Sequence, residues 1–243
     1  MTKIVMVISC FEKADEMYKF FQSIEESDLT YVPRITVINT DPENNLTGKQ
    51  NIKVAQHFKR QGDRIFVSHK NLYMSPYRYV IQKYAVGYDF MIGTEADVWF
   101  EIPFRFGNSL KYMQRHPEVA TITCLARYQT DKQNEYQFKD IPSWKQVGQY
   151  LESPRSVPWH MCLTRVPYML GFFNTGYELI DTPFTRYCLK MQRKMLVLDC
   201  RDYCVHFDYH ATIKKYPYYA KLCGIKHYDI QHRLVEDKDI EEI

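Results

Sequence analysis

The feature that most constrains the fold is an alternation of apolar strands with amphipathic helices, which occurs three times before residue 90. The strands are expected at residues 3–10, 34–39 and 64–68, and the helices at residues 15–27, 48–60 and 77–86. β-branched apolar runs favour strands, whereas apolar residues three or four apart favour helices. Because parallel strands need long crossover connections, this order predicts an α/β fold with a mostly parallel sheet covered by helices on both faces.

A fourth apolar run follows, and it ends in two carboxylates. Phe90-Met91-Ile92 leads directly into Thr94-Glu95-Ala96-Asp97. Taken alone, this pattern favours two solvated acids at a strand end. In an open α/β sheet, however, ligands bind outside the carboxyl ends of the strands. Oxygen ligands at such an edge suit Mg²⁺ or Mn²⁺ holding a phosphate, so the three preceding strand–helix units give the acids a second interpretation.

The remaining sequence has a weaker pattern. Helices are expected at residues 103–116, 165–170, 183–194 and 213–222, and strands at residues 119–125, 159–163 and 195–198. Residues 127–158 are interpreted as a long excursion with one short helix over residues 144–151. Residues 200–210 are expected to be extended, and the acidic residues 236–242 to be a solvated terminus.

Composition limits the class of protein. The chain has 243 residues, 45% hydrophobic and 25% charged, which is enough for a sizeable globular core. The net charge of +3 is dispersed among acids, which argues against binding to nucleic acid. The seven cysteines form no Cys-x-x-Cys pair and mostly lie in apolar runs, as reduced thiols do. With no secretory signal and no membrane-length apolar run, we expect a soluble cytoplasmic protein with no transmembrane segment.

Five segments occur in an order that resembles the GT-A glycosyltransferases, most of all the inverting family-2 type. They are VISCFEKADEMYKFFQSIEES, ITVINTDPEN, GYDFMIGTEADVWF, GFFNTGYELIDTPFTRYCLKM and YCVHFDYHAT. The resemblance extends from Lys3 to about His210 and depends on order and spacing, because each segment alone is loose. It implies a GT-A, Rossmann-like fold, a divalent metal (Mn²⁺ or Mg²⁺) and a nucleoside diphosphate sugar donor linked to UDP, GDP or dTDP. The acceptor would be a hydroxyl of a glycan or small molecule.

The resemblance also implies how the chain is organised. We expect a single domain over residues 1–243, with a nucleotide-sugar-binding half over residues 1–100. An acceptor and catalytic half follows over residues 101–235, and residues 236–243 form the acidic tail.

The resemblance assigns the donor site to residues near the carboxyl ends of the first strands. Glu95-Ala96-Asp97 matches the Asp-x-Asp motif of the family, with Asp97 as the direct metal ligand and Glu95 acting through water or the ribose. The other donor-binding residues that it implies are Ser9, Phe11, Glu12, Asn39, Asn71 and Arg78. Two residues depart from the family pattern, since Glu95 replaces an Asp and Asn39 stands where many members have an Asp. Arg78 is equally consistent with an exposed helix cation.

The second half of the chain supplies the other implied site residues. Asp181 matches the catalytic base, which in an inverting transfer accepts the proton of the attacking hydroxyl. The alternative for Asp181 is a simple helix N-cap. His206 matches a metal-binding histidine, with His210 as second choice. A zinc site built from the neighbouring cysteines lacks the usual spacing.

The aromatic residues and the reaction outcome leave alternatives open. Trp99 and Trp159 could shape the acceptor site, although core packing is expected for at least two of the three tryptophans. A retaining GT-A glycosyltransferase and a non-catalytic nucleotide- or glycan-binding protein are the alternatives to an inverting enzyme.

Overall fold

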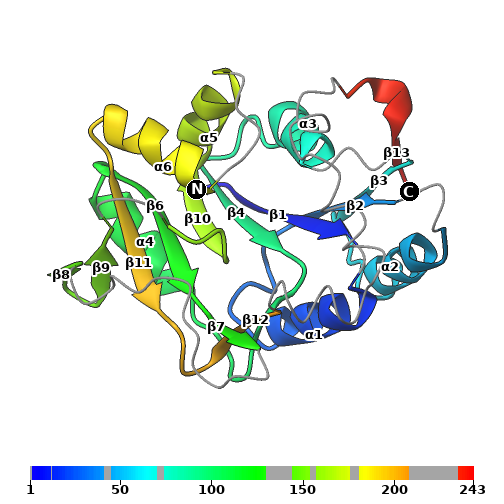
Figure 1. Ribbon diagram of the computed structural model, residues 1–243, viewed down its shortest axis with the longest axis horizontal. Helices are drawn as coiled ribbons and strands as arrows, with labels where there is room; N and C mark the ends of the chain where they lie inside the picture. Colours follow the sequence, from blue (N-terminus) through cyan, green and yellow to red (C-terminus); the bar gives the residue numbers. More distant parts are fainter. Residues whose placement is uncertain are drawn as a thin grey trace.

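The computed structural model describes most of the chain. The described residues are 2–11, 13–40, 45–69, 74–129, 144–153, 157–175, 181–207 and 235–243. In these ranges six α-helices flank a large sheet, and a small second sheet lies at one edge of it (Figure 1).

The large sheet has ten strands in the order β13-β3-β2-β1-β4-β10-β6-β11-β9-β8. The strands are β1 (Ile4–Phe11), β2 (Arg34–Asn39), β3 (Arg64–Ser68), β4 (Phe90–Glu95), β6 (Val119–Leu125), β8 (Lys145–Val147), β9 (Tyr150–Glu152), β10 (Cys162–Arg165), β11 (Lys194–Asp199) and β13 (Ile240–Glu242). β1 to β4 are parallel, and β10 runs antiparallel between β4 and β6. β6 and β11 are parallel to each other, so they share the direction of β1 to β4. The predicted α/β fold with a mostly parallel sheet is therefore confirmed.

Helices cover both faces of this sheet, because successive residues of each strand point to opposite sides. α1 (Ala14–Glu25), α2 (Asn45–His57) and α4 (Gly107–Arg115) pack on the face of Met6 and Ile8. α3 (Ser75–Tyr84), α5 (Val166–Phe173) and α6 (Asp181–Lys190) pack on the face of Val5 and Val7 (Figure 1). The buried face of α1 consists of Met17, Phe20, Phe21 and Ile24, which have the helical spacing expected from the sequence.

The small sheet has the order β5-β12-β7, from β5 (Val98–Phe100), β12 (Cys204–Phe207) and β7 (Arg127–Gln129). β5 follows β4 directly, so this sheet stands next to the carboxyl end of β4 (Figure 1). It joins segments from both predicted halves of the chain.

Several sequence predictions about the second half are wrong in their detail. The helix expected over residues 144–151 is instead the β8–β9 hairpin. Its two-residue connection starts with Gly148 at φ 60°, as a type II′ turn requires, and β9 pairs with β11. The strand expected at residues 159–163 begins only at Cys162, because Met161 has φ 48° and breaks the extended backbone. Of residues 200–210, Cys204–Phe207 are a strand and residues 201–203 form a turn; residues 208–210 and the helix expected at 213–222 lie outside the described residues.

The acidic C-terminal residues are an ordered edge strand, not the expected solvated terminus. A short 3₁₀ helix, η2 (Asp237–Asp239), leads into β13, which pairs antiparallel with β3 (Figure 1). Glu242 lies 2.5 Å from Arg64, and Glu241 lies 2.9 Å from His69. These acids therefore lie against one basic residue in β3 and one just after it. Such pairs join distant parts of the sequence, so the charges within residues 236–242 alone do not reveal them.

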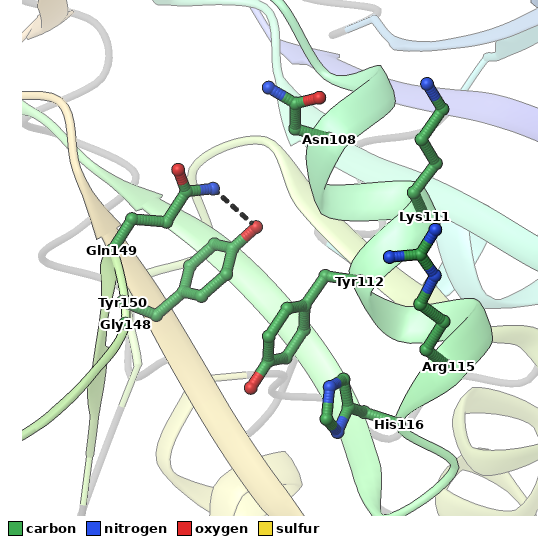
Figure 2. Close-up of a pocket in the computed structure, with 8 residues that line it drawn as sticks. All are labelled: Asn108, Lys111, Tyr112, Arg115, His116, Gly148, Gln149 and Tyr150. Atoms are coloured by element: carbon green, nitrogen blue, oxygen red, sulfur yellow. Dashed lines mark hydrogen bonds between the residues drawn. The ribbon is translucent and has the colours of Figure 1, made fainter.

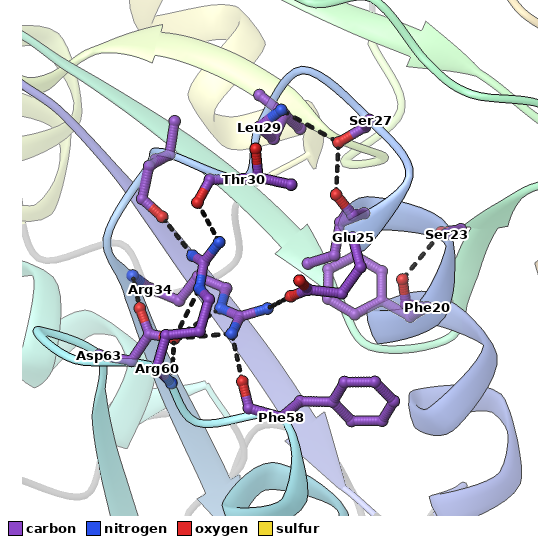
Figure 3. A network of polar contacts seen from close by, with 12 residues as sticks. Phe20, Ser23, Glu25, Ser27, Leu29, Thr30, Arg34, Phe58, Arg60 and Asp63 are labelled. Carbon is purple, nitrogen blue, oxygen red and sulfur yellow. Dashed lines mark hydrogen bonds and ion pairs between the residues drawn. The ribbon is translucent and has the colours of Figure 1, made fainter.

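A buried ion-pair network fixes the beginning of β2 (Figure 3). Asp63 accepts the backbone N–H of Arg34 at 2.9 Å and binds its guanidinium at 2.7 and 2.8 Å. Arg60 and Glu25 complete the network. Because Arg34 is only 2% exposed, these partners satisfy a charge that the fold has removed from water.

Candidate functional site

The two acids of the sequence motif lie at the carboxyl edge of the sheet, as predicted. Glu95 is the last residue of β4 and is the register partner of Ser9 in β1. The Ala96 N–H donates to the Ser9 carbonyl oxygen at 2.9 Å, which holds the turn after β4 against β1. The central position of these two strands places the motif where ligands of open α/β sheets bind.

The small sheet brings a histidine to these acids from the far end of the chain. β12 pairs antiparallel with β5, with His206 opposite Val98. The Phe207 N–H donates to the Asp97 carbonyl oxygen at 3.0 Å, which ties β12 to the turn. His206 Nε2 consequently lies 3.5 Å from Glu95 Oε2 and 3.6 Å from Asp97 Oδ2.

Glu95, Asp97 and His206 form a group, the carboxylate–histidine cluster, that could hold a metal ion. One ligand atom from each residue lies within 4.8 Å of the others. Asp97 is 3% exposed, and its Oδ1 has no hydrogen-bond partner among the described residues. Leaving a buried carboxylate oxygen without a partner is costly, and a cation would remove that cost. Two carboxylates and one imidazole are therefore a donor set that fits a divalent ion.

Lys13, which the sequence analysis did not single out, is the fourth charged residue of the site. Its ammonium forms an ion pair with Asp97 Oδ2. Lys13 has φ 60°, a left-handed conformation that costs a residue with a side chain roughly 1–2 kcal/mol. Its carbonyl oxygen accepts the Met17 N–H at 2.9 Å and so begins α1. Strained backbone of this kind often occurs at functional sites, but the sequence shows no glycine or asparagine to mark it.

The charges of the cluster support one another. For His206, burial lowers the pKa, but the charges of Asp97 and Glu95 outweigh burial and raise it to about 9. Burial also lowers the pKa of Lys13, but the charges of Asp97 and Glu95 outweigh burial and raise this pKa above its usual value. Burial would raise the pKa of Asp97, whereas Lys13 and His206 hold it well below its usual value. At neutral pH Asp97 is thus ionised between two cations, Lys13 and His206.

A second histidine packs behind the cluster. The rings of His160 and His206 have their centroids 4.3 Å apart. His160 is 3% exposed, and its Nδ1 has no hydrogen-bond partner among the described residues. Burial and the charge of His206 lower the pKa of His160 well below its usual value, so it packs as a neutral ring. His160 is not among the site residues predicted from the sequence.

The predicted donor-binding residues lie at several places around this edge. Ser9 and Phe11 are half-buried near the end of β1, and Asn39 is buried at the end of β2, where it is the register partner of Phe11. Ala96 is buried in the turn after β4. Arg78 lies on α3 and donates to the Phe173 carbonyl oxygen at 2.9 Å. Glu12, Asn71 and His210 lie outside the described residues.

The other predicted site residues are placed as follows. Asp181 is the first residue of α6, and its side chain lies outside what the structure describes. Trp99 is 9% exposed in β5, next to Val205 and Phe207. Trp159 is 5% exposed and packs against Gly93 of β4, where a side chain would overlap its indole ring. Both rings contribute to packing.

Within the described residues, the carboxylate–histidine cluster is the only group of three metal-ligand side chains. The six cysteines that the structure describes are buried free thiols. Burial raises the pKa of Cys204, which keeps that thiol neutral. The zinc site considered from the sequence therefore has no support in this part of the chain.

An open cavity of about 540 Å³ lies elsewhere, between α4 and the β8–β9 hairpin (Figure 2). Its lining consists of Asn108, Lys111, Tyr112, Arg115, His116, Gly148, Gln149 and Tyr150. The Tyr112 and Tyr150 rings have their centroids 4.8 Å apart. None of the site residues predicted from the sequence lines this cavity.

The described residues have an α/β fold that is consistent with a GT-A-like fold. The fold is similar to that of TarS from S. aureus. The TarS structure matches with a TM-score of 0.54 and 10% identity, over 85% of this chain and 37% of TarS. A TarS 1–349 structure in complex with UDP matches with a TM-score of 0.56 and 9% identity, over 85% of this chain and 61% of that one. The chain thus covers less than two thirds of each of these TarS chains.

Comparisons by sequence add nothing to this likeness. No protein-family model matches the chain, and no curated protein matches it. Among the helices that the structure describes, none combines the length and apolar character needed to cross a membrane.

Proposed function

We propose that the chain is a metal-dependent glycosyltransferase that moves a sugar from a nucleoside diphosphate sugar to a hydroxyl acceptor. The observation that carries the proposal is the carboxylate–histidine cluster at the carboxyl edge of a GT-A-like sheet. One buried carboxylate oxygen of this cluster has no hydrogen-bond partner in the described part of the chain. The likeness to TarS, which was solved with UDP, supports a nucleotide donor and makes UDP-sugars the first to test.

Three side chains would hold the divalent ion, Mn²⁺ or Mg²⁺. Asp97 is the most buried of them and would bind directly, and the more exposed Glu95 would bind directly or through water. His206 would supply a nitrogen ligand after releasing its proton to solvent, since its pKa is raised to about 9 before a metal binds. When bound, the ion would supply positive charge that stabilises the departing diphosphate. Buried Asn39 and half-buried Ser9 and Phe11, at the strand ends, would then hold the nucleoside.

Asp181 would accept the proton of the attacking hydroxyl, so that the transfer inverts the anomeric carbon. Its position at the first residue of α6 supports this role, because a helix N-terminus stabilises a carboxylate as the anion. We expect Asp181→Asn to lower transfer at least ~100-fold while donor binding is largely kept. Asp199→Asn, which removes a half-exposed acid on β11, should leave transfer unchanged.

The experiment is a transfer and donor-hydrolysis assay over UDP-, GDP- and dTDP-sugars in Mn²⁺, in EDTA, and after Mn²⁺ is added back. Turnover that disappears in EDTA and returns with Mn²⁺ is expected. Absence of turnover over the whole panel, with nucleotide still bound in Mn²⁺, would instead support a non-catalytic nucleotide-binding protein. Retention of anomeric configuration, seen by NMR of the product, would exclude Asp181 as the base and indicate a retaining enzyme.

A further inference from the structure

Lys13 and a metal ion compete for the same carboxylate, that of Asp97. The Lys13 ammonium forms its ion pair with Asp97 Oδ2, the oxygen that lies 3.6 Å from His206 Nε2. The side chains of Lys13 and Asp97 are 15% and 3% exposed, so water and salt screen this pair weakly. A divalent ion bound through the same oxygen would repel the ammonium at close range. An ion at the other oxygen would also lie close to the ammonium, so metal binding at Asp97 is expected to displace Lys13 from this carboxylate.

The carbonyl oxygen of Lys13 is held by α1, whereas its side chain is long and flexible. Lys13 is the N-cap residue of α1, and its carbonyl oxygen accepts the Met17 N–H. The flexible four-carbon stem of a lysine can still swing its ammonium by several ångströms. Because Lys13 lies at the carboxyl edge of the sheet, a diphosphate bound there would come within reach of that ammonium.

We infer that Lys13 exchanges partners when the donor binds, leaving Asp97 for a phosphate oxygen of the nucleoside diphosphate and so opening Asp97 to the divalent ion. Before the exchange, the ammonium neutralises Asp97 in place of a metal. After it, the ammonium neutralises the donor while the metal neutralises the carboxylates. This inference rests on the proposed function, since it names how that same site is loaded.

The exchange makes metal and nucleotide bind cooperatively. Metal alone binds weakly, because it must displace a buried ion pair and is repelled by the nearby ammonium. Nucleotide draws the ammonium to its phosphate, and the coupling must act equally in both directions. The empty enzyme is thereby protected from taking up a divalent ion without its donor.

The test separates the two contacts that Lys13 makes. In the first arm, Mn²⁺ binding to the whole chain without nucleotide is followed by EPR of free Mn²⁺, for the wild type and Lys13→Met. In the second arm, UDP binding in EDTA is followed by calorimetry for the same proteins. We expect Lys13→Met to bind Mn²⁺ about tenfold more tightly and UDP about tenfold more weakly, within the range of typical couplings.

Three further variants keep the result interpretable. Lys13→Arg retains the charge and should stay within about threefold of the wild type in the Mn²⁺ arm. Lys13→Gly removes the side chain at a position where glycine adopts φ 60° without strain, and it replaces Lys13→Met if that variant does not fold. Lys53→Met removes one exposed charge on α2 and should change neither arm.

The outcomes distinguish the inference from the proposed function. If the Lys13 variants lacking the charge bind Mn²⁺ no more tightly than the wild type, or bind UDP equally well in EDTA, the exchange is wrong. A loss of both affinities would show that Lys13 only supports the local structure, and this also overturns the inference. Neither arm needs a sugar donor or turnover, so a failed transfer assay contradicts the proposed function without deciding the exchange.

Discussion

Asp63→Asn is expected to be strongly destabilising, because Asp63 neutralises a guanidinium that the fold has buried (Figure 3). Oδ2 of Asp63 lies 2.7 and 2.8 Å from two nitrogens of Arg34, and Oδ1 accepts the Arg34 backbone N–H. An amide at this position could still accept that N–H. It would, however, carry no charge, and its own N–H groups would face those of the guanidinium.

The size of the effect follows from what remains around Arg34. Breaking a buried ion pair by removing one partner costs about 3–5 kcal/mol. Here Glu25, 39% exposed and 2.7 Å away, stays as a second acid, so a value near the lower limit is expected. A loss of about 3 kcal/mol would lower the melting temperature of a chain of this size by roughly 6–12 °C.

Urea unfolding at pH 7 measures this loss, and Glu242→Gln is the matched control. The Arg64–Glu242 pair has the same chemistry, but its side chains are 35% and 43% exposed. Exposed pairs contribute about 0–1 kcal/mol, so the control should change little although the pair is 2.5 Å apart. An Asp63→Asn cost below about 1 kcal/mol, or one no larger than the control, would refute the argument from burial.

Three other predictions follow from described contacts. Burial raises the pKa of Asp63, but hydrogen bonds from Arg34 outweigh it and hold the pKa below its usual value. The contribution of Asp63 to the free energy of unfolding is therefore complete above about pH 4 and is lost as the pH falls through the folded-state pKa. The difference in unfolding free energy between wild type and Asp63→Asn should consequently be smaller in urea unfolding at pH 3 than at pH 7. An unchanged difference would contradict this prediction. Gly93→Ala should cost about 2 kcal/mol in the same assay, because the added methyl overlaps an indole ring, and a cost below about 0.5 kcal/mol would show that the ring moves freely. Finally, Asp97→Asn should weaken Mn²⁺ binding in the presence of UDP at least tenfold, and Glu95→Gln should weaken it about threefold, because the Asp97 side chain is 3% and the Glu95 side chain 42% exposed. A sample of UDP and Mn²⁺ without protein serves as the blank. A larger effect of Glu95→Gln would exchange the roles of the two acids.

The parts of the fold that could be predicted from the sequence are those set by local periodicity. The apolar spacing of α1 and the β-branched runs of β1, β2 and β3 each satisfy a pattern within one segment. The hairpin at residues 145–152 was not predicted, because its strands are only three residues long and show no clear periodicity. What stabilises them is pairing with β11, which no local window contains.

The strand β13 was not predicted for a related reason. A run rich in acids favours a solvated terminus when only its own charges are counted. In the structure β13 pairs with β3, and its acids lie against Arg64 and His69, which stand more than 170 positions earlier in the chain. Charged edge strands, whose partners lie far away in the sequence, are therefore difficult to identify from local patterns.

The same limit applies to the site, and it explains why the acid pair was ambiguous in the sequence. Glu95 and Asp97 alone are two like charges, which would repel each other unless solvated or bound to a cation. In the structure, Lys13 and His206 bring two positive charges from the beginning of α1 and from β12, so the cluster is balanced before any ion or donor binds. A balanced site has little electrostatic reason to bind a free divalent ion. It gains one when a ligand carrying its own negative charge arrives, and this is why a phosphate-bearing donor and a metal are expected to bind there together.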